Sequence, residues 1–589
     1  MESSKSFKGY GKVDELEEQA FRRKTRKRLI IIIVSVVVLV AVIIGVVAAT
    51  VIHKRRTSSS SDNTVPPTEL TPAASLKAVC DVTQYPSSCF SSISSLANSN
   101  TTDPEVLFKL SLHVAIDELS KLSNYSSKLL ANTNDTHLKS ALNVCETLFD
   151  DALDQLNESI SSMEVGNGGK ILSASKINDI ETWLSTTITD QETCLDSLEE
   201  LNTTIAHELV QNVKTAMENS TEFASNSLAI VTKILSLLAN FNIPIHRRLL
   251  GFGSSDSEFP AWVGPVERRL LQADTNGTTS QVTVAQDGSG DFKMIKEAVA
   301  AVPKKSETRF VIYVKEGKYL ENVILDKNKW NVMMYGDGKT KTIISGSLNF
   351  IDGTPTFATA TVAVAGRGFI AKDIGFVNTA GAAKHQAVAF RSGSDRSVYY
   401  RCSFDAFQDT LYAHSNRQFY RECDVTGTID FIFGNAAVVF QNCNIMPRQP
   451  LPNQFNTITA QGKKDPNQNT GILIQKSKFY ALEHNLTAPT YLGRPWKEFS
   501  TTVIMQSDIG PFLNPLGWKE WIANVEPPSS ILYAEYENSG PGSTVTGRIK
   551  WAGYMSTLTE DEAARFTVES FIQGSEWLPE TTVTFDSSL

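Results

Sequence analysis

The sequence predicts a multidomain chain in which one transmembrane helix precedes an all-α helix bundle and then a parallel β-helix. Three observations predict this fold class. Residues 29–52 are almost entirely apolar. Residues 73–237 carry apolar side chains at helical spacing and contain very little glycine. After Gln281, short runs rich in Val, Ile, Phe and Tyr alternate with Gly, Asn and Asp turns, and several residue types recur about every 20 residues.

The apolar stretch at 29–52 is interrupted only by Ser35 and Thr50. About 20 apolar residues suffice to cross the hydrocarbon layer as a helix, and no clear cleavage signal follows. The denser basic cluster precedes the stretch, so the positive-inside rule predicts that residues 1–28 are a cytoplasmic tail. A buried core helix is the alternative, but it does not need such uniform apolarity. We therefore expect a signal anchor at 29–52 and a Ser/Thr/Pro-rich stalk at 53–72.

Composition indicates an exported protein that does not bind nucleic acid. The chain has 589 residues, of which 41% are hydrophobic, and a formal net charge of −9, which argues against a nucleic-acid partner. Four of its seven cysteines fall in one segment, as two disulfides would require, and no C-x-x-C pair suggests zinc. Eight N-x-S/T sequons agree with secretion: Asn100, Asn124, Asn134, Asn157, Asn202, Asn219, Asn276 and Asn485.

Two folded regions and a linker follow the stalk. The periodicity of residues 73–237 predicts an antiparallel helix bundle. The polar linker at 238–280 contains Arg-Arg-Leu-Leu twice, at 247–250 and at 268–271. A pair of basic residues is often only a solvated surface feature, but its repetition in one linker favours two sites for a processing protease.

A repeat of about 20 residues in the region 281–586 predicts the β-helix, because one turn of such a coil takes roughly that length. A β-sandwich is the alternative, but it does not explain why cysteines and polar residues share one period. The residues that recur with this spacing are Cys402, Cys423 and Cys443, then Gln386 and Gln408, and finally Asp409 and Asp430.

Asp409 and Asp430 are the candidate catalytic pair. Residues one coil apart lie about 4.8 Å from each other on one face of the coil. Two neighbouring carboxyl groups in a partly apolar site do not both ionise easily, so the pKa of one rises. The protonated one suits a general acid, and the ionised one suits a nucleophile or base. Asp in a β-helix turn is more often structural than catalytic, so the spacing alone does not decide the matter.

Other polar residues converge on the same period. Gln386 and Gln408 are neutral amide donors suited to an oxyanion. Arg494 is placed to pair with Asp430 in a bidentate way, and Trp496 offers a flat face for a sugar. The chain has no G-x-S-x-G nucleophile elbow and no Walker or dinucleotide glycine motif.

From 281 to 586 the chain closely resembles the plant pectin methylesterases. The resemblance implies a right-handed parallel β-helix, hydrolysis of methyl esters on homogalacturonan, and no metal or organic cofactor. The motifs that carry it, in order, are VAQDGSGDF (284–292), GFIAKDIGFVNTAG (368–381), KHQAVAFR (384–391), FQDTLY (407–412), RQFYREC (417–423), GTIDFIFGNAAVVFQ (427–441), ITAQGKKDPNQNTGI (458–472), YLGRPWKEFS (491–500) and FIQGSEWLP (571–579).

The resemblance also implies roles for individual residues. Asp430 matches the nucleophile, and Asp409 matches the proton donor that later acts as a base. Gln386 and Gln408 match the donors that stabilise the tetrahedral anion, and Arg494 matches the residue that pairs with the nucleophile. Thr356, Gln386, Arg494 and Trp496 match substrate-binding positions, Tyr412 and Phe433 fit the aromatic rim, and the family disulfide matches Cys423–Cys443.

The helical region is similar to the pectin methylesterase inhibitor family, through VCDVTQYPSSC (79–89), Cys145 and TWLSTTITDQETCLD (182–196). This resemblance implies a four-helix bundle with Cys80–Cys89 and Cys145–Cys194 paired. It implies that the bundle covers the catalytic groove or aids folding until the linker is cut. We therefore expect a membrane-anchored precursor in the secretory pathway and a mature enzyme in the extracellular cell wall. The alternatives are a catalytically silent pectin-binding or inhibitory protein, and a polysaccharide lyase, which would need an acidic calcium-binding cluster.

Overall fold

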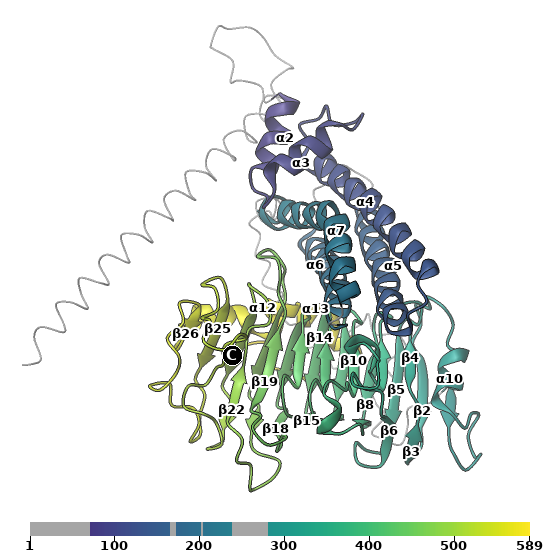
Figure 1. Cartoon of the computed structure of the whole chain (residues 1–589), viewed down its shortest axis with the longest axis vertical. Helices are drawn as coiled ribbons and strands as arrows, with labels where there is room; N and C mark the ends of the chain where they lie inside the picture. Colours follow the sequence, from purple (N-terminus) through teal and green to yellow (C-terminus); the bar gives the residue numbers. More distant parts are fainter. Residues whose placement is uncertain (1–70, 165–171, 202–203, 238–280) are drawn as a thin grey trace, which may run out of the picture. The chain divides into compact units, whose positions relative to one another are not determined.

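The computed structural model describes residues 71–164, 172–201, 204–237 and 281–589 (Figure 1). The membrane part of the predicted fold class is wrong for these residues, because none of their helices combines the length and the apolarity needed to cross a bilayer. The predicted anchor at 29–52 lies outside the described residues, as do the predicted tail at 1–28 and the linker at 238–280. We therefore correct the fold class of the described chain to a helical region followed by a parallel β-helix.

The first half of the described chain is helical, as predicted. Asp103 caps one long helix by accepting a hydrogen bond from the Glu105 N–H, and Pro104 occupies its first turn. Ser173 caps another by accepting from the Lys176 N–H. The helices are α2 (Pro72–Cys80), α3 (Pro86–Ser94), α4 (Pro104–Asn132), α5 (Thr136–Glu164), α6 (Ala174–Glu199), α7 (Thr204–Ile230) and the π-helical turn η1 (Val231–Leu235).

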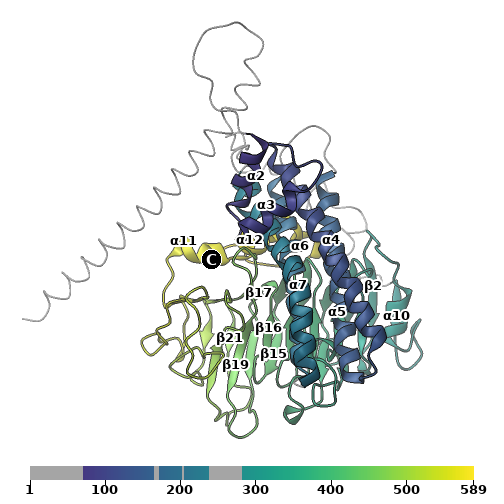
Figure 2. The ribbon, with the colours of Figure 1, turned by 45° about the horizontal axis from the view of Figure 1, so that its top comes forward.

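Helices α4 to α7 pack against one another through an apolar core and run side by side in Figure 2. Leu112, Leu156 and Leu184 are fully buried in this core. Two disulfides join the region, Cys80–Cys89 and Cys145–Cys194. They confirm the two pairings that the inhibitor resemblance implied.

The second half is a β-helix of three parallel sheets, which confirms the fold predicted from the repeat. The 11-stranded sheet contains β1 (Val282–Val284), β2 (Phe310–Val314), β5 (Val332–Gly336), β8 (Ile370–Lys372), β11 (Ser397–Tyr400), β14 (Arg417–Arg421), β17 (Ala437–Gln441), β20 (Gly471–Gln475), β23 (Thr501–Met505), β25 (Leu532–Tyr536) and β26 (Tyr554–Met555). The seven-stranded sheet contains β4 (Val323–Leu325), β7 (Val362–Val364), β10 (Phe390–Ser392), β13 (Leu411–Ala413), β16 (Ile432–Gly434), β19 (Asn456–Gln461) and β22 (Thr490–Gly493). The eight-stranded sheet contains β3 (Gly317–Leu320), β6 (Thr342–Gly346), β9 (Gly375–Asn378), β12 (Ser403–Asp405), β15 (Asp424–Gly427), β18 (Asn444–Pro447), β21 (Lys478–Phe479) and β24 (Asp508–Ile509).

The core of the β-helix consists of side chains that stack from one coil to the next. Tyr399, Tyr420 and Phe440 are in register on β11, β14 and β17, and their rings stack at 4.3 and 4.5 Å between centroids. The other face of the 11-stranded sheet is also apolar in its middle, so strands β14, β17, β20 and β23 are buried on both sides. The short helices α11 (Glu560–Ala563), α12 (Val568–Ile572) and α13 (Gly574–Trp577) contribute to the second apolar cluster.

One predicted cysteine pairing is wrong. Cys402, Cys423 and Cys443 are all free and buried inside the coil. The Cys423 thiol donates to the Tyr399 carbonyl at 3.3 Å, and the Cys443 thiol donates to the Tyr420 carbonyl at 3.5 Å. Cys423 and Cys443 therefore each have a backbone partner on the preceding coil, and they are not bonded to each other.

Candidate active site

Four predicted catalytic residues lie at coil corners just before strands of the seven-stranded sheet, and Arg494 directly follows β22 of that sheet. Gln386 precedes β10, Gln408 and Asp409 precede β13, and Asp430 precedes β16. Gln386 and Gln408 are direct partners in a parallel bridge, so they occupy the same position on adjacent coils. Asp409 and Asp430 have φ angles of 62° and 51°, a left-handed conformation that Asp tolerates better than most residues. Such backbone positions are common at functional sites.

Asp430 is held by two side chains from later coils. Arg494 donates from Nε to Oδ1 at 2.9 Å and from Nη2 to Oδ2 at 2.6 Å, which is a bidentate ion pair. Thr457 donates its hydroxyl to Oδ1 at 2.6 Å and accepts the Asp430 N–H at 3.0 Å. Burial alone would lower the pKa of Arg494, but the charge of Asp430 raises that pKa overall. These three hydrogen bonds fix the orientation of the Asp430 carboxyl group.

Asp409 has the opposite environment. Its side chain is 8% exposed, and within the described residues its carboxyl group forms no ion pair and no hydrogen bond. Burial raises its pKa well above the usual value, and the negative charges of Asp430 and Glu200 raise it further. The two adjacent acids therefore have different surroundings, because Asp430 is paired with Arg494 whereas Asp409 is buried without such a partner among the described residues.

The two glutamines have amide groups available for a ligand. Both side chains are half-buried, and within the described residues neither amide makes a hydrogen bond. Their backbone groups are occupied by neighbouring coils, since Ala387 N–H donates to the Gln408 carbonyl and Phe350 N–H donates to the Gln386 carbonyl. The backbone is therefore fixed while the amides remain free to donate to an oxyanion.

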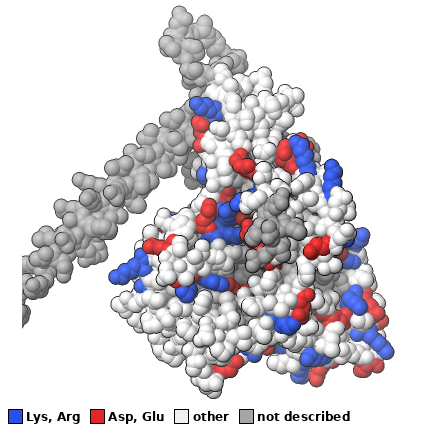
Figure 3. All heavy atoms as spheres, in the orientation of Figure 1, with Lys and Arg blue, Asp and Glu red and all other residues white. Residues whose placement is uncertain are grey.

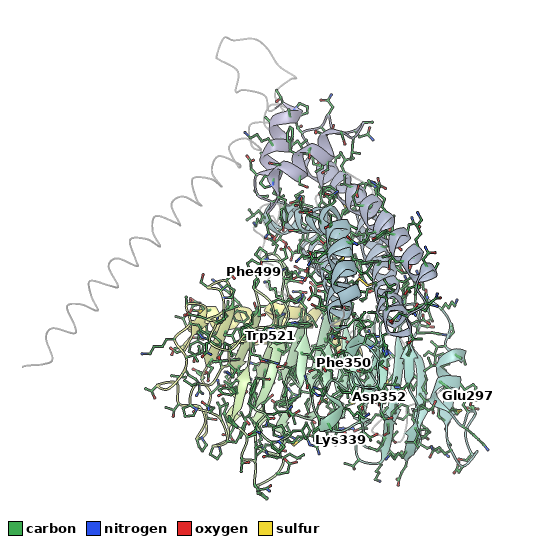
Figure 4. All side chains as sticks on the ribbon, in the orientation of Figure 1. Glu297, Lys339, Phe350, Asp352, Phe499 and Trp521 are labelled. Carbon is green, nitrogen blue, oxygen red and sulfur yellow. A yellow bond between two sulfur atoms is a disulfide. The ribbon has the colours of Figure 1, made fainter. Side chains whose placement is uncertain are left out.

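A wall of aromatic rings continues the site along the sheet. The rings of Tyr412 and Phe433 stack at 4.1 Å, Phe433 lies 6.3 Å from Trp496, and Trp496 stacks with Trp521 at 6.2 Å. Trp521 comes from the loop between β24 and β25 and is labelled in Figure 4. A row of rings of this kind suits a sugar chain, whose C–H faces pack on aromatic surfaces.

The aromatic wall and the carboxylates enclose a cavity of about 350 Å³. All of the predicted catalytic and substrate-binding residues line it. They are Thr356, Gln386, Gln408, Asp409, Tyr412, Asp430, Phe433, Arg494 and Trp496.

Helix α6 of the inhibitor-like region forms the opposite wall of this cavity. Glu200, at its carboxyl end, accepts a hydrogen bond from the Thr356 N–H at 3.0 Å. Lys497 donates to Asp196 at 2.5 Å and lies 3.5 Å from Glu192. Burial raises the pKa of Glu200 to about 7 and that of Asp196 to about 6. The bundle therefore places carboxyl groups directly over the catalytic cleft.

Sequence reasoning missed several residues that line or stabilise the site. Thr457 stabilises Asp430, and Phe357 and Trp521 line the cavity. Thr457 lies 27 residues after Asp430, because the coil between them carries a longer loop. That length hides it from a search for a period of about 20 residues. The motif ITAQ begins one residue after Thr457, and it was the sequence feature that could have identified this threonine as part of the site.

Among the described residues, no three His, Cys, Asp or Glu side chains converge in a way that would hold a metal ion. The predicted absence of a cofactor stays a prediction.

Comparisons with known proteins agree with this geometry. Residues 281–575 match the pectinesterase family model, and residues 74–230 match that of the plant invertase/pectin methylesterase inhibitor family. The chain is 68% identical over 592 residues to pectinesterase 3 of Phaseolus vulgaris, with 100% of both chains covered. It is 64% identical over 590 residues to pectinesterase 1 of Arabidopsis thaliana, with 99% of both covered. The solved structure of pectin methylesterase from carrot aligns with a TM-score of 0.52 and 53% identity, over 54% of this chain and 100% of that one.

Proposed function

Because the chain belongs to the pectinesterase family, we propose that it hydrolyses methyl esters of homogalacturonan with Asp430 as the nucleophile. The products are a free carboxylate on the polymer and methanol. One observation supports these roles above the others. Arg494 pairs with Asp430 through both of its oxygens, whereas burial and neighbouring charge favour the protonated form of Asp409.

In the first step, a carboxylate oxygen of Asp430 attacks the ester carbonyl carbon. The carbonyl oxygen becomes an oxyanion that accepts hydrogen bonds from the Gln386 and Gln408 amides. When the tetrahedral species collapses, the bond to the methoxy oxygen breaks. Asp409 gives its proton to that oxygen, and methanol leaves. An acyl-enzyme anhydride on Asp430 remains.

In the second step, Asp409 is a carboxylate and takes a proton from water. The resulting hydroxide attacks the carbonyl carbon of the anhydride, and the bond to the Asp430 oxygen breaks. The polymer gains a carboxyl group, Asp430 is again a carboxylate, and Asp409 is again protonated. The sum is one ester and one water converted to one acid and one methanol.

The inhibitor-like bundle is suited to block this chemistry in the uncut chain. Glu200 occupies the Thr356 N–H, at a predicted substrate-binding position, and Asp196 engages Lys497 beside Trp496. A domain on the same chain acts at high effective concentration. We further propose that a protease cuts at 247–250 or 268–271, outside the described residues, and that the mature enzyme acts in the cell wall.

The test is methanol release from esterified pectin by the chain cut within residues 238–280. Asp430→Asn should abolish turnover, and Asp409→Asn should slow it by roughly 10²- to 10⁴-fold, the usual contribution of a general acid. Asp424→Asn on the eight-stranded sheet is the matched control and should retain activity. A cut wild-type chain that binds pectin but releases no methanol would instead support the catalytically silent alternative.

A further inference from the structure

Besides Lys497 and Arg417, three basic side chains on the β-helix form ion pairs with the helical bundle. Lys327 lies 2.6 Å from Asp150 and 2.8 Å from Asp154. Arg367 lies 3.3 Å from Glu158, and Arg396 lies 2.8 Å from Asp179. We call Lys327, Arg367 and Arg396 the basic corner. Within the described residues, every carboxylate paired with the basic corner comes from α5 or α6.

The three cations lie on consecutive coils, at the corner between the seven-stranded and 11-stranded sheets. Lys327 lies between β4 and β5, Arg367 between β7 and β8, and Arg396 between β10 and β11. Neighbouring coils are about 4.8 Å apart along the axis, so the charges form a short row. Gln386, Gln408, Asp409 and Asp430 lie at the other end of the seven-stranded sheet's strands, and none of the basic corner lines the catalytic cavity.

Trp330 contacts two residues of the basic corner and fixes their positions. The Arg367 guanidinium lies 3.7 Å from the centre of the Trp330 ring, and the Trp330 indole N–H donates to the Lys327 carbonyl at 2.8 Å. These groups line a pocket of about 500 Å³ together with the acidic faces of α5 and α6. The Arg367 side chain is 45% exposed and the Arg396 side chain 38% exposed even beside the bundle.

We propose that the basic corner is a second binding site, separate from the catalytic cleft, for a polymer that carries many carboxylates. The occupant that fits is de-esterified homogalacturonan, a choice that rests on the proposed function because this polymer is the reaction product. In the uncut chain, the carboxylates of α5 and α6 stand in for those of the polymer. Once the bundle leaves, three cations lose their ion-pair partners together.

Chemistry and geometry both favour a polycarboxylate at this site. Guanidinium groups match the planar carboxylate better than other side chains do, and a row of charges on successive coils complements a linear chain with repeated charges. In the uncut chain the row is neutralised by the bundle. Figure 3 shows basic and acidic side chains intermixed on one face of the molecule. By binding the carboxylates of the product, the site retains the enzyme on stretches of pectin that it has already de-esterified.

The experiment measures binding of polygalacturonate, which carries no ester, to the chain cut within 238–280 and freed of the bundle. The triple variant Lys327→Gln, Arg367→Gln and Arg396→Gln should bind roughly tenfold more weakly at low salt, since exposed charge pairs contribute modestly each. The difference should shrink as salt is added. Methanol release from short esterified oligomers should stay as in the wild type. The matched control is Lys304→Gln, Lys318→Gln and Lys478→Gln, which removes three exposed lysines from elsewhere on the β-helix.

Three outcomes would overturn the proposal of a second binding site. Unchanged polygalacturonate affinity in the triple variant would overturn the proposal, as would an equal loss in the control triple variant. Equal wild-type affinity for fully esterified pectin would show that carboxylates are not recognised, and would overturn it too. A failure of the proposed function would appear separately, as wild-type chain that binds polygalacturonate but releases no methanol from esterified pectin.

Discussion

The ion pair between Arg494 and Asp430 gives the sharpest prediction, through Arg494→Lys. The arginine donates two hydrogen bonds, at 2.9 and 2.6 Å, to a carboxylate that is only 5% exposed. Lysine keeps the positive charge but replaces the planar fork with a single point of contact. One lost hydrogen bond to a charged group is worth about 1.5–3 kcal/mol. If the lost hydrogen bond misorients the nucleophile and raises the activation barrier by this amount, kcat should drop roughly 10- to 150-fold, at about 1.36 kcal/mol per factor of ten.

The assay is the initial rate of methanol release from esterified pectin by the cut chain, with kcat and KM measured separately. The matched control is Arg548→Lys, because Arg548 forms a similar buried pair with Glu535, at 2.8 and 3.1 Å. The control variant should lose stability in thermal unfolding and keep its kcat. A kcat for Arg494→Lys within about twofold of wild type would refute the claim that the bidentate geometry orients the nucleophile, since even 1.5 kcal/mol exceeds that ratio.

Thr457→Val removes a 2.6 Å hydrogen bond to Asp430 and should lower kcat roughly tenfold, whereas Thr457→Ser should restore most of the rate; equal rates for both would contradict the role. After linker cleavage, the bundle should remain bound near pH 5 and dissociate towards pH 8 in size-exclusion chromatography. Burial raises the pKa of Asp196 to about 6 and of Glu200 to about 7, and a raised carboxyl pKa favours the contact at low pH and opposes it as pH rises. Glu200→Gln should weaken this pH dependence, and a retention profile unaffected by pH would count against it. Cys145→Ser opens a disulfide that spans 49 residues and should destabilise the bundle by about 4 kcal/mol in denaturant unfolding; a change below about 1 kcal/mol would argue against that estimate.

The β-helix could be predicted because its coils have nearly constant length where the chemistry lies. Gln386 and Gln408 recur at the coil period and are direct partners in the structure. The helical bundle followed from periodicity, and its disulfides followed from the resemblance to the inhibitor family. The resemblance to the pectin methylesterases also implied the Cys423–Cys443 pairing, which is wrong, and it did not reveal the hydrogen bonds of these thiols to backbone carbonyls.

The limits of sequence reasoning lie where the coil length changes or where another domain intervenes. Thr457 was hidden by a longer coil, although it bonds directly to the nucleophile candidate. Glu200 belongs to a different domain, so no period within the β-helix connects it to Thr356. The membrane span was inferred from apolarity alone, and no helix of the described chain supports it.

The position of Glu200 bears on chemistry as well as on access. Its negative charge adds to that of Asp430 in raising the pKa of Asp409, and the covering helix contributes to the burial of the same carboxyl. The proposed cycle needs Asp409 to release a proton to methanol and then recover one from water, which is fastest when its pKa is near the working pH. Removal of the bundle admits water and removes the nearby charge of Glu200, and both changes lower the pKa of Asp409 towards that range. Cleavage would therefore uncover the substrate site and retune the acid in a single event.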